Sequence, residues 1–187
     1  YSMKQQYIYL VFTKTGTWLS RTLNFFENSD YIHVSLGLDN PLNNLYSFGR
    51  TNPSNPFSGG FVVEDLSEGI YKRFEDTSLC IYRLKVTEKQ YYILRKKISP
   101  FIISKHSYRY NFIGLFGLWF NLPVNRSFHF FCSQFVSLAL TQAGIYRPQK
   151  AFGLIKPCDL LQIKALELVY KGTIKSYINE KSYAIEA

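Results

Sequence analysis

Six segments of the chain have the hydrophobic pattern of β-strands. Residues 7–12 form a continuous apolar run, which is typical of a buried strand. Residues 32–38 alternate instead, so that His33, Ser35 and Gly37 share one face while the apolar side chains share the other. The turn sequence at 39–41 predicts that this strand pairs with the next one as a hairpin. The other predicted strands cover residues 45–48, 61–63, 78–86 and 168–170.

Four segments predict helices. The clearest is 131–143, where apolar residues recur at helical spacing and Gly144 follows at the position where helices often end. Thr87 is the expected N-cap of a helix that runs to about residue 98 and stops before Pro100. The other two predicted helices cover residues 18–26 and 159–166. The aromatic segment between residues 104 and 126 contains Gly, Pro and Asn, so no regular helix is expected throughout it.

The length and composition predict one folded domain. The chain has 187 residues, of which 47% are hydrophobic and only 19% charged, and this balance excludes a disordered protein. No repeat or linker divides it, so the domain is taken as residues 3–187, with Tyr1-Ser2 interpreted as a remnant of cloning. If Met3 is the native start, the lack of a signal sequence predicts a cytoplasmic protein. The longest apolar run is too short to span a membrane.

The net charge of +9 favours acidic partners, and the cysteines favour a reducing compartment. A basic protein attracts phosphates, anionic lipid or an acidic cell-wall polymer, and contact at the membrane periphery fits this charge. The basic residues are scattered and match no nucleic-acid-binding motif, so no nucleic acid partner is expected. Three cysteines with no close pair argue against a disulfide framework.

Cys132 and His33 are the residues best placed for chemistry. Cys132 stands at the start of the clearest helix, where free amides and the helix dipole favour a thiolate. The same amides suit the oxyanion of an acyl-transfer intermediate. His33 lies on the polar face of its strand, beside two small residues. The alternatives are a buried structural cysteine and a half-exposed surface histidine.

A metal site has little support in the sequence. His129 and Cys132 form a single HxxC pair, and a zinc site needs more ligands than one such pair supplies. We therefore expect no metal and no cofactor.

Two further blocks resemble a known family. Residues 10–38 contain a Leu-Ser-Arg element (19–21) and a Tyr-x-His-Val strand (31–34), and residues 130–136 read FFCSQFV. These blocks resemble the YiiX-like, circularly permuted branch of the NlpC-type papain superfamily, and the lecithin retinol acyltransferase-like proteins are similar in layout. The resemblance spans roughly residues 7–159.

The resemblance implies an α+β, papain-like fold with circularly permuted topology. An antiparallel, barrel-like β half carrying His33 precedes the helix that carries Cys132. The family implies Cys132 as nucleophile and His33 as base and later acid. The position that matches its third catalytic group is Ser47, although the family often has Glu there, and Glu64 or Asp65 is the alternative.

The expected function is therefore a cysteine hydrolase that cleaves an amide or ester bond. By resemblance, its substrate is a cell-wall-type peptide or a lipid-like acyl amide, and we expect Tyr108, Tyr110 and Ser133 to contact it. One alternative is a thiol acyltransferase, because the thioester step is common to both reactions. The other is a non-catalytic module that binds lipid or a membrane surface. The sequence leaves the oligomeric state open.

Overall fold

The computed structural model describes residues 6–14, 32–40, 42–52, 55 and 58–186. The predicted helix at 18–26, with its Leu-Ser-Arg element, lies outside these residues. The described part contains helices, strands and two short 3-10 turns. It confirms the α+β class that the resemblance implies.

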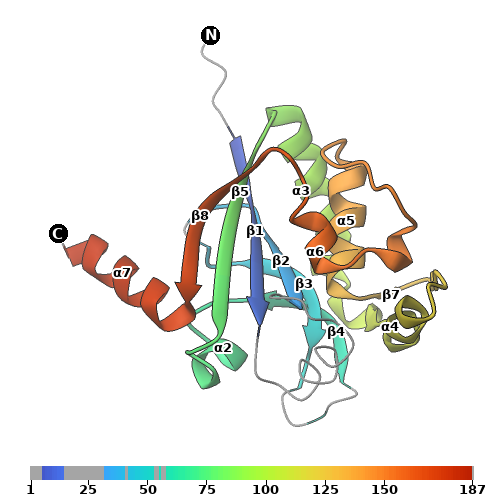
Figure 1. Ribbon diagram of the computed structural model, residues 1–187, viewed down its shortest axis with the longest axis horizontal. Helices are drawn as coiled ribbons and strands as arrows, with labels where there is room; N and C mark the ends of the chain where they lie inside the picture. The colour runs from blue at the N-terminus through green and yellow to red at the C-terminus, as the bar shows by residue number, and fades with distance from the viewer. Residues whose placement is uncertain (1–5, 15–31, 41, 53–54, 56–57, 187) are drawn as a thin grey trace.

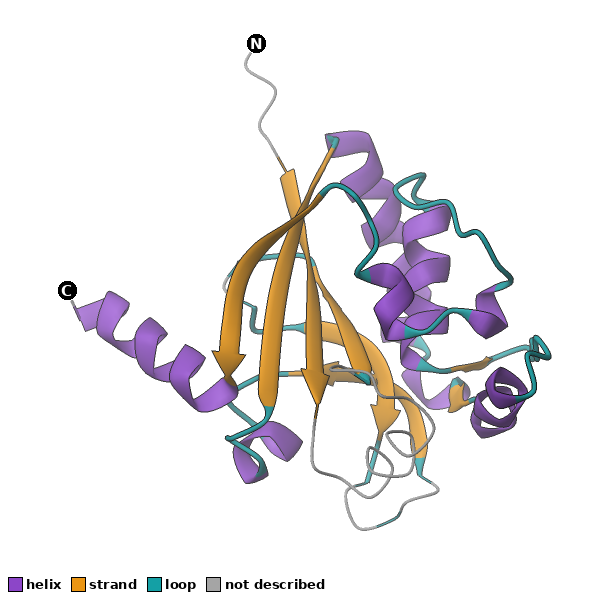
Figure 2. Ribbon diagram, viewed as in Figure 1, coloured by secondary structure: helices purple, strands orange, loops and turns teal. Residues whose placement is uncertain are grey.

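Eight strands form a single sheet in the order β7-β6-β4-β3-β2-β1-β5-β8. Figure 2 shows the strands in orange and the helices in purple. All neighbouring strands are antiparallel except β6 and β7, which are parallel. All six predicted strands are present, and the prediction for residues 78–86 has the observed bounds. The strands are β1 (Gln6–Lys14), β2 (His33–Gly37), β3 (Leu45–Arg50), β4 (Gly59–Glu64), β5 (Ser78–Val86), β6 (Arg109–Tyr110), β7 (His129–Phe130) and β8 (Leu166–Thr173).

A layer of helices covers one face of the sheet (Figure 1). It contains α3 (Glu88–Ile103), α4 (Phe112–Trp119), α5 (Cys132–Gln142) and α6 (Pro157–Leu160). The core beneath it joins Val34 and Leu36 of β2 to Phe135 and Val136 of α5. Burial of this apolar surface fixes α5 against β2 and β3, and so sets where the helix begins.

The opposite face of the sheet has a smaller core. Tyr71 of α2 (Gly69–Arg73) and Ile174, the first residue of α7 (Ile174–Glu186), pack there against Val11 and Leu79. His33 and Ser35 alternate along β2 with Val34 and Leu36, as the sequence predicts.

Two predicted helix ends are wrong. Thr87 does cap α3, through a capping box with Gln90, but the helix continues through Pro100 to Ile103. Phe101 packs against the rings of Phe61 and Tyr108, and this packing stabilises a last turn that proline alone would disfavour.

The helix predicted at 159–166 is the second error, because α6 ends at Leu160. Leu166 is already paired with Leu84 as the start of β8, so the chain must leave the helix before it. The end of α5 agrees with prediction: Gly144 follows with a φ of 68°. Among the described residues, no helix has the length and apolar character needed to cross a membrane.

Candidate active site

The thiol of Cys132 lies at the junction of α5 and β2. Cys132 is the first residue of α5, as predicted, and the N-cap residue Phe131 provides no side-chain cap for the helix. The first amides of a helix have no partner within the helix, so these amides can bind an anion. The Cys132 Sγ atom is 4.0 Å from the carbonyl oxygen of Ile32, the residue directly before His33.

His33 lies beside a carboxylate, directly after the residue whose carbonyl contacts this thiol. Its Nε2 atom is 3.1 Å from Oε2 of Glu64, at the end of β4. The Ser35 hydroxyl donates to the same Oε2 at 2.6 Å and lies 3.2 Å from Nε2. The His33 and Glu64 side chains are only 18% and 14% exposed, so the pair is largely shielded from water. Shielding strengthens the attraction between the two groups.

The structure corrects the expected position of Ser47. This residue is fully buried, and its hydroxyl donates to the backbone carbonyl of Val34 at 2.8 Å, not to the imidazole of His33. The hairpin register places Leu36 opposite Tyr46. Continued along both strands, this register puts Gly49 opposite His33. Glu64, the alternative taken from the sequence, is the residue that contacts the imidazole.

Gly49 lies beside both members of the pair. A Cβ atom at this position would be 3.8 Å from Cε1 of His33 and 3.6 Å from Oε1 of Glu64. The lack of a side chain therefore leaves room for the imidazole and the carboxylate to meet across β3.

The charges of the site support one another. Burial alone lowers the pKa of His33, but the Glu64 carboxylate and a hydrogen bond with the Cys132 thiol outweigh it, so this pKa is raised well above 6.5. Burial raises the pKa of Glu64, but the His33 charge and hydrogen bonds from His33, Ser35 and Tyr71 bring it below its usual value. Both shifts favour an imidazolium–carboxylate pair over two neutral groups.

Ser35 and Tyr71 are members of the site that the sequence analysis missed. Tyr71 is fully buried on α2, and its pKa is raised well above 10 by burial and by the Glu64 charge, so its hydroxyl stays protonated. Ser35 could have been predicted as a site residue, because residues i and i+2 of a strand share a face and Ser35 follows His33 by two positions. Tyr71 could not have been predicted from the sequence, since it reaches the site from a separate helix.

The three predicted substrate contacts have different positions. Tyr110 and Ser133 line a pocket of about 40 Å³ at the Cys132 thiol. The Ser133 hydroxyl, however, donates to the carbonyl of Ile155 at 2.6 Å, so it already has a structural role. Tyr108 does not line this pocket: it stacks on Phe101 at a centroid distance of 4.4 Å.

The walls of the Cys132 pocket are mostly apolar. Leu115, Leu118 and Trp119 come from α4, and Phe131 precedes the thiol, with Lys156 at the other side. A pocket with such walls suits an apolar group attached to the reacting carbon. A larger pocket of about 560 Å³ borders Glu64 from the far side of β4, and neither His33 nor Cys132 lines it.

The described residues provide no metal site. Within them, no three His, Cys, Asp or Glu side chains are grouped as metal ligands. His129, half of the HxxC pair, is held by a hydrogen bond of 2.8 Å between its Nδ1 atom and the carbonyl of Ser127.

The fold and the site together describe an α+β protein in which an imidazole on β2 pairs with a carboxylate on β4 near the thiol that begins α5. The chain matches no known family model, and no curated protein or solved structure is significantly similar to it.

Replacing Glu64 with glutamine should lower the pKa of His33, because it removes a nearby opposite charge and leaves burial in place. The measurement is an NMR titration of the His33 ring. An unchanged titration of His33 would show that Glu64 does not hold the imidazolium.

The same pair should make stability depend on pH. The raised pKa of His33 stabilises the fold below pH 6.5, and this contribution is lost as pH rises through the folded-state value. The lowered pKa of Glu64 stabilises the fold above pH 4.5, and this contribution is lost as pH falls through its folded-state value. The Glu64→Gln protein should lose both contributions.

Proposed function

We propose that this protein is a cysteine hydrolase that cleaves an ester or amide bond through Cys132, His33 and Glu64. The observation that carries the proposal is the position of His33: its Nε2 atom is 3.1 Å from Oε2 of Glu64, and the carbonyl oxygen of the preceding residue, Ile32, is 4.0 Å from the Cys132 Sγ atom. A buried carboxylate that orients the imidazole, and an imidazole that activates the thiol, are the parts that thiol chemistry requires.

In the proposed reaction, the Cys132 sulfur attacks the acyl carbon and a carbon–sulfur bond forms. The amides at the start of α5 stabilise the negative oxygen of the tetrahedral intermediate. The bond to the leaving oxygen or nitrogen then breaks, and His33 gives its proton to that atom. Water attacks the thioester with His33 as base, which releases the carboxylic acid and restores the thiol.

Glu64 is a positioning residue in this scheme. It contacts Nε2, so Nδ1 is the ring nitrogen left for the thiol. Its charge favours the imidazolium that forms when the thiol gives up its proton, which a serine at the same place would do less well. Ser35 and Tyr71 hold the carboxylate through hydrogen bonds.

The pocket favours an acyl group over a peptide side chain with charge. Among the described residues, its walls include five apolar or aromatic side chains and no acidic one: Tyr110, Leu115, Leu118, Trp119 and Phe131. We therefore place the lipid-like acyl substrate before the cell-wall-type peptide. The permuted papain-like topology is part of this proposal, and the chain order of His33 before Cys132 supports it.

The decisive experiment is alkylation of each cysteine with iodoacetamide as a function of pH, mapped by mass spectrometry. Cys132 should react faster than Cys158 near neutral pH, because the proposed reaction needs a reactive sulfur beside His33, and the His33→Ala protein should lose this reactivity. Cys158, a partly exposed thiol, is the internal control and should behave alike in both proteins.

A slow Cys132 that reacts equally in both proteins would reject the proposal. Because Cys132 is only 5% exposed, the small reagent is needed to reach it. Methyl methanethiosulfonate, which is also small, would repeat the comparison and separate poor access from poor reactivity.

A further inference from the structure

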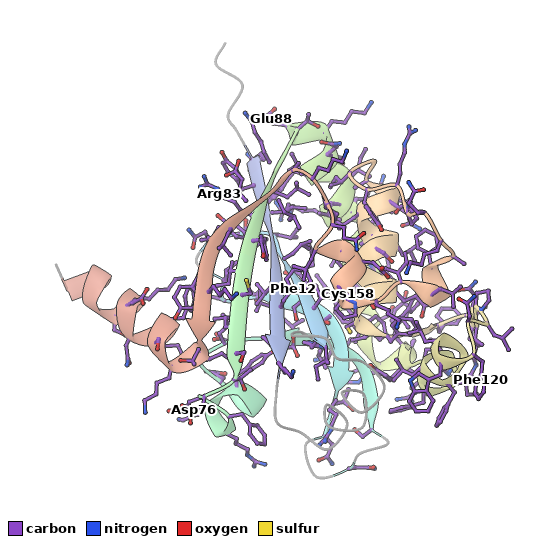
Figure 3. All side chains as sticks on the ribbon, viewed as in Figure 1. Phe12, Asp76, Arg83, Glu88, Phe120 and Cys158 are labelled. Carbon is purple, nitrogen blue, oxygen red and sulfur yellow. The ribbon has the colours of Figure 1, made fainter. Side chains whose placement is uncertain are left out.

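The outer face of α4 carries large apolar side chains exposed to solvent. Ile113, Phe116 and Phe120 recur at helical spacing, and they are 55%, 56% and 73% exposed. Figure 3 shows Phe120 at the outer edge of the molecule, beyond the end of α4. Leu122 and Phe128 extend the group with exposures of 61% and 57%. These five residues are called the α4 patch below.

Hydrogen bonds fix the helix and the loop that carry the α4 patch. The Asn111 side chain caps α4 by accepting from the amide of Gly114 at 3.0 Å and donating to the carbonyl of Val124 at 3.1 Å. The amide of Leu122 donates to the carbonyl of Gly117 at 2.8 Å. A side chain at Gly117 would collide with that backbone, since its Cβ would lie 2.5 Å from the oxygen of Leu122. The exposed rings are thus held outward by a defined structure.

The stretch of the chain that contains the α4 patch carries charge of a single sign. From Lys89 to Cys158 the chain has ten Lys and Arg residues and no Asp or Glu. The rest of the chain carries twelve Lys and Arg against thirteen Asp and Glu, so the excess charge belongs to this stretch. The stretch includes α3, α4 and α5, and exposed Arg109 and Arg126 lie in the chain on either side of α4.

We propose that the α4 patch docks on an anionic lipid surface. Apolar and aromatic side chains that project from a basic surface are the features with which interfacial helices enter a membrane. Lys and Arg near such a helix are attracted by anionic headgroups. A second copy of this chain fits less well, because two faces of the same positive charge repel each other.

Docking through the α4 patch would also bring lipid to the thiol. The inner side of the same helix, through Leu115, Leu118 and Trp119, lines the pocket of Cys132. The docking itself does not depend on the proposed hydrolysis, so the two proposals can fail separately.

The test is sedimentation of the full chain with vesicles of phosphatidylcholine alone or with 30% phosphatidylglycerol. The protein should bind the anionic vesicles at least tenfold more strongly, and added salt should weaken this binding. Phe116→Ser combined with Phe120→Ser should reduce binding at least tenfold. Leu168→Ser is the matched control, because Leu168 is 56% exposed on β8, and it should bind as the unaltered protein does.

Two additional variants keep the test decisive. Phe120→Ser alone changes the most exposed ring and should still weaken binding if the double variant does not fold. Cys132→Ser should bind vesicles normally, which separates docking from thiol chemistry. Equal binding to both vesicle types would overturn the proposal. Equal losses of vesicle binding in the patch variants and the Leu168→Ser control would also overturn it. A patch variant that changes only the oligomeric state, measured by light scattering, would do the same.

Discussion

Replacing His33 with alanine is expected to slow hydrolysis of p-nitrophenyl butyrate by about 10²- to 10⁴-fold, the usual contribution of a positioned acid–base group. The ester has a short apolar acyl chain, which suits the apolar walls at Cys132. The loss should appear in kcat more than in KM, because His33 acts on the proton that moves in the reaction and does not line the acyl pocket.

Cys132→Ala should reduce the rate to that of buffer, because no thioester can form without the sulfur atom. Cys158→Ala should leave the rate unchanged and serves as the control. The double variant, with both His33 and Cys132 replaced, should be no slower than Cys132→Ala alone, since the two residues act as one unit. Turnover that survives in Cys132→Ala would place the chemistry at another site.

The strands could be predicted from the sequence because their apolar pattern is local. Residues 78–86 and 32–38 carry a run or an alternation that only a strand satisfies, and both form strands. The hairpin between β2 and β3 was also predictable from its turn. Its register was not, because that depends on how side chains pack on the finished sheet.

Because the register could not be predicted, the expected partner of His33 was wrong. Ser47 was the expected partner of His33, yet the observed register sends its hydroxyl to the carbonyl of Val34. Glu64 lies 31 residues from His33 in the chain, and a third strand separates the two in the sheet. A contact of this kind depends on the curvature and order of three strands, which no local pattern encodes.

The predicted ends of two helices were wrong for a similar reason. Pro100 is a local signal for the end of α3, but Phe101 extends this helix through its contacts with other elements. The pairing of β8 shortens α6. In both places tertiary packing outweighs propensity. The start of α5, by contrast, lies within one residue of the prediction, because the apolar stripe that buries the helix is a local pattern in the sequence.

Phe135→Ala should lower the free energy of unfolding by about 3 to 5 kcal/mol, the range for deleting a buried phenylalanine ring. Phe135 is fully buried on α5, and its ring centroid lies 5.0 Å from Phe101, 5.4 Å from Phe48 and 5.6 Å from Phe61. These rings come from a helix and two strands, so the cavity has walls on several elements and cannot close by the movement of one.

Urea denaturation followed by circular dichroism measures this loss, with Phe120→Ala as the matched control. Phe120 is 73% exposed, so its removal should change stability by no more than about 0.5 kcal/mol. Because Phe135 lies one turn after Cys132, its loss should also loosen the start of α5, and alkylation of Cys132 should then lose its dependence on His33. A Phe135→Ala protein as stable as the Phe120→Ala protein would mean that the aromatic cluster does not fix α5 on the sheet, and another contact must hold the thiol beside the imidazole.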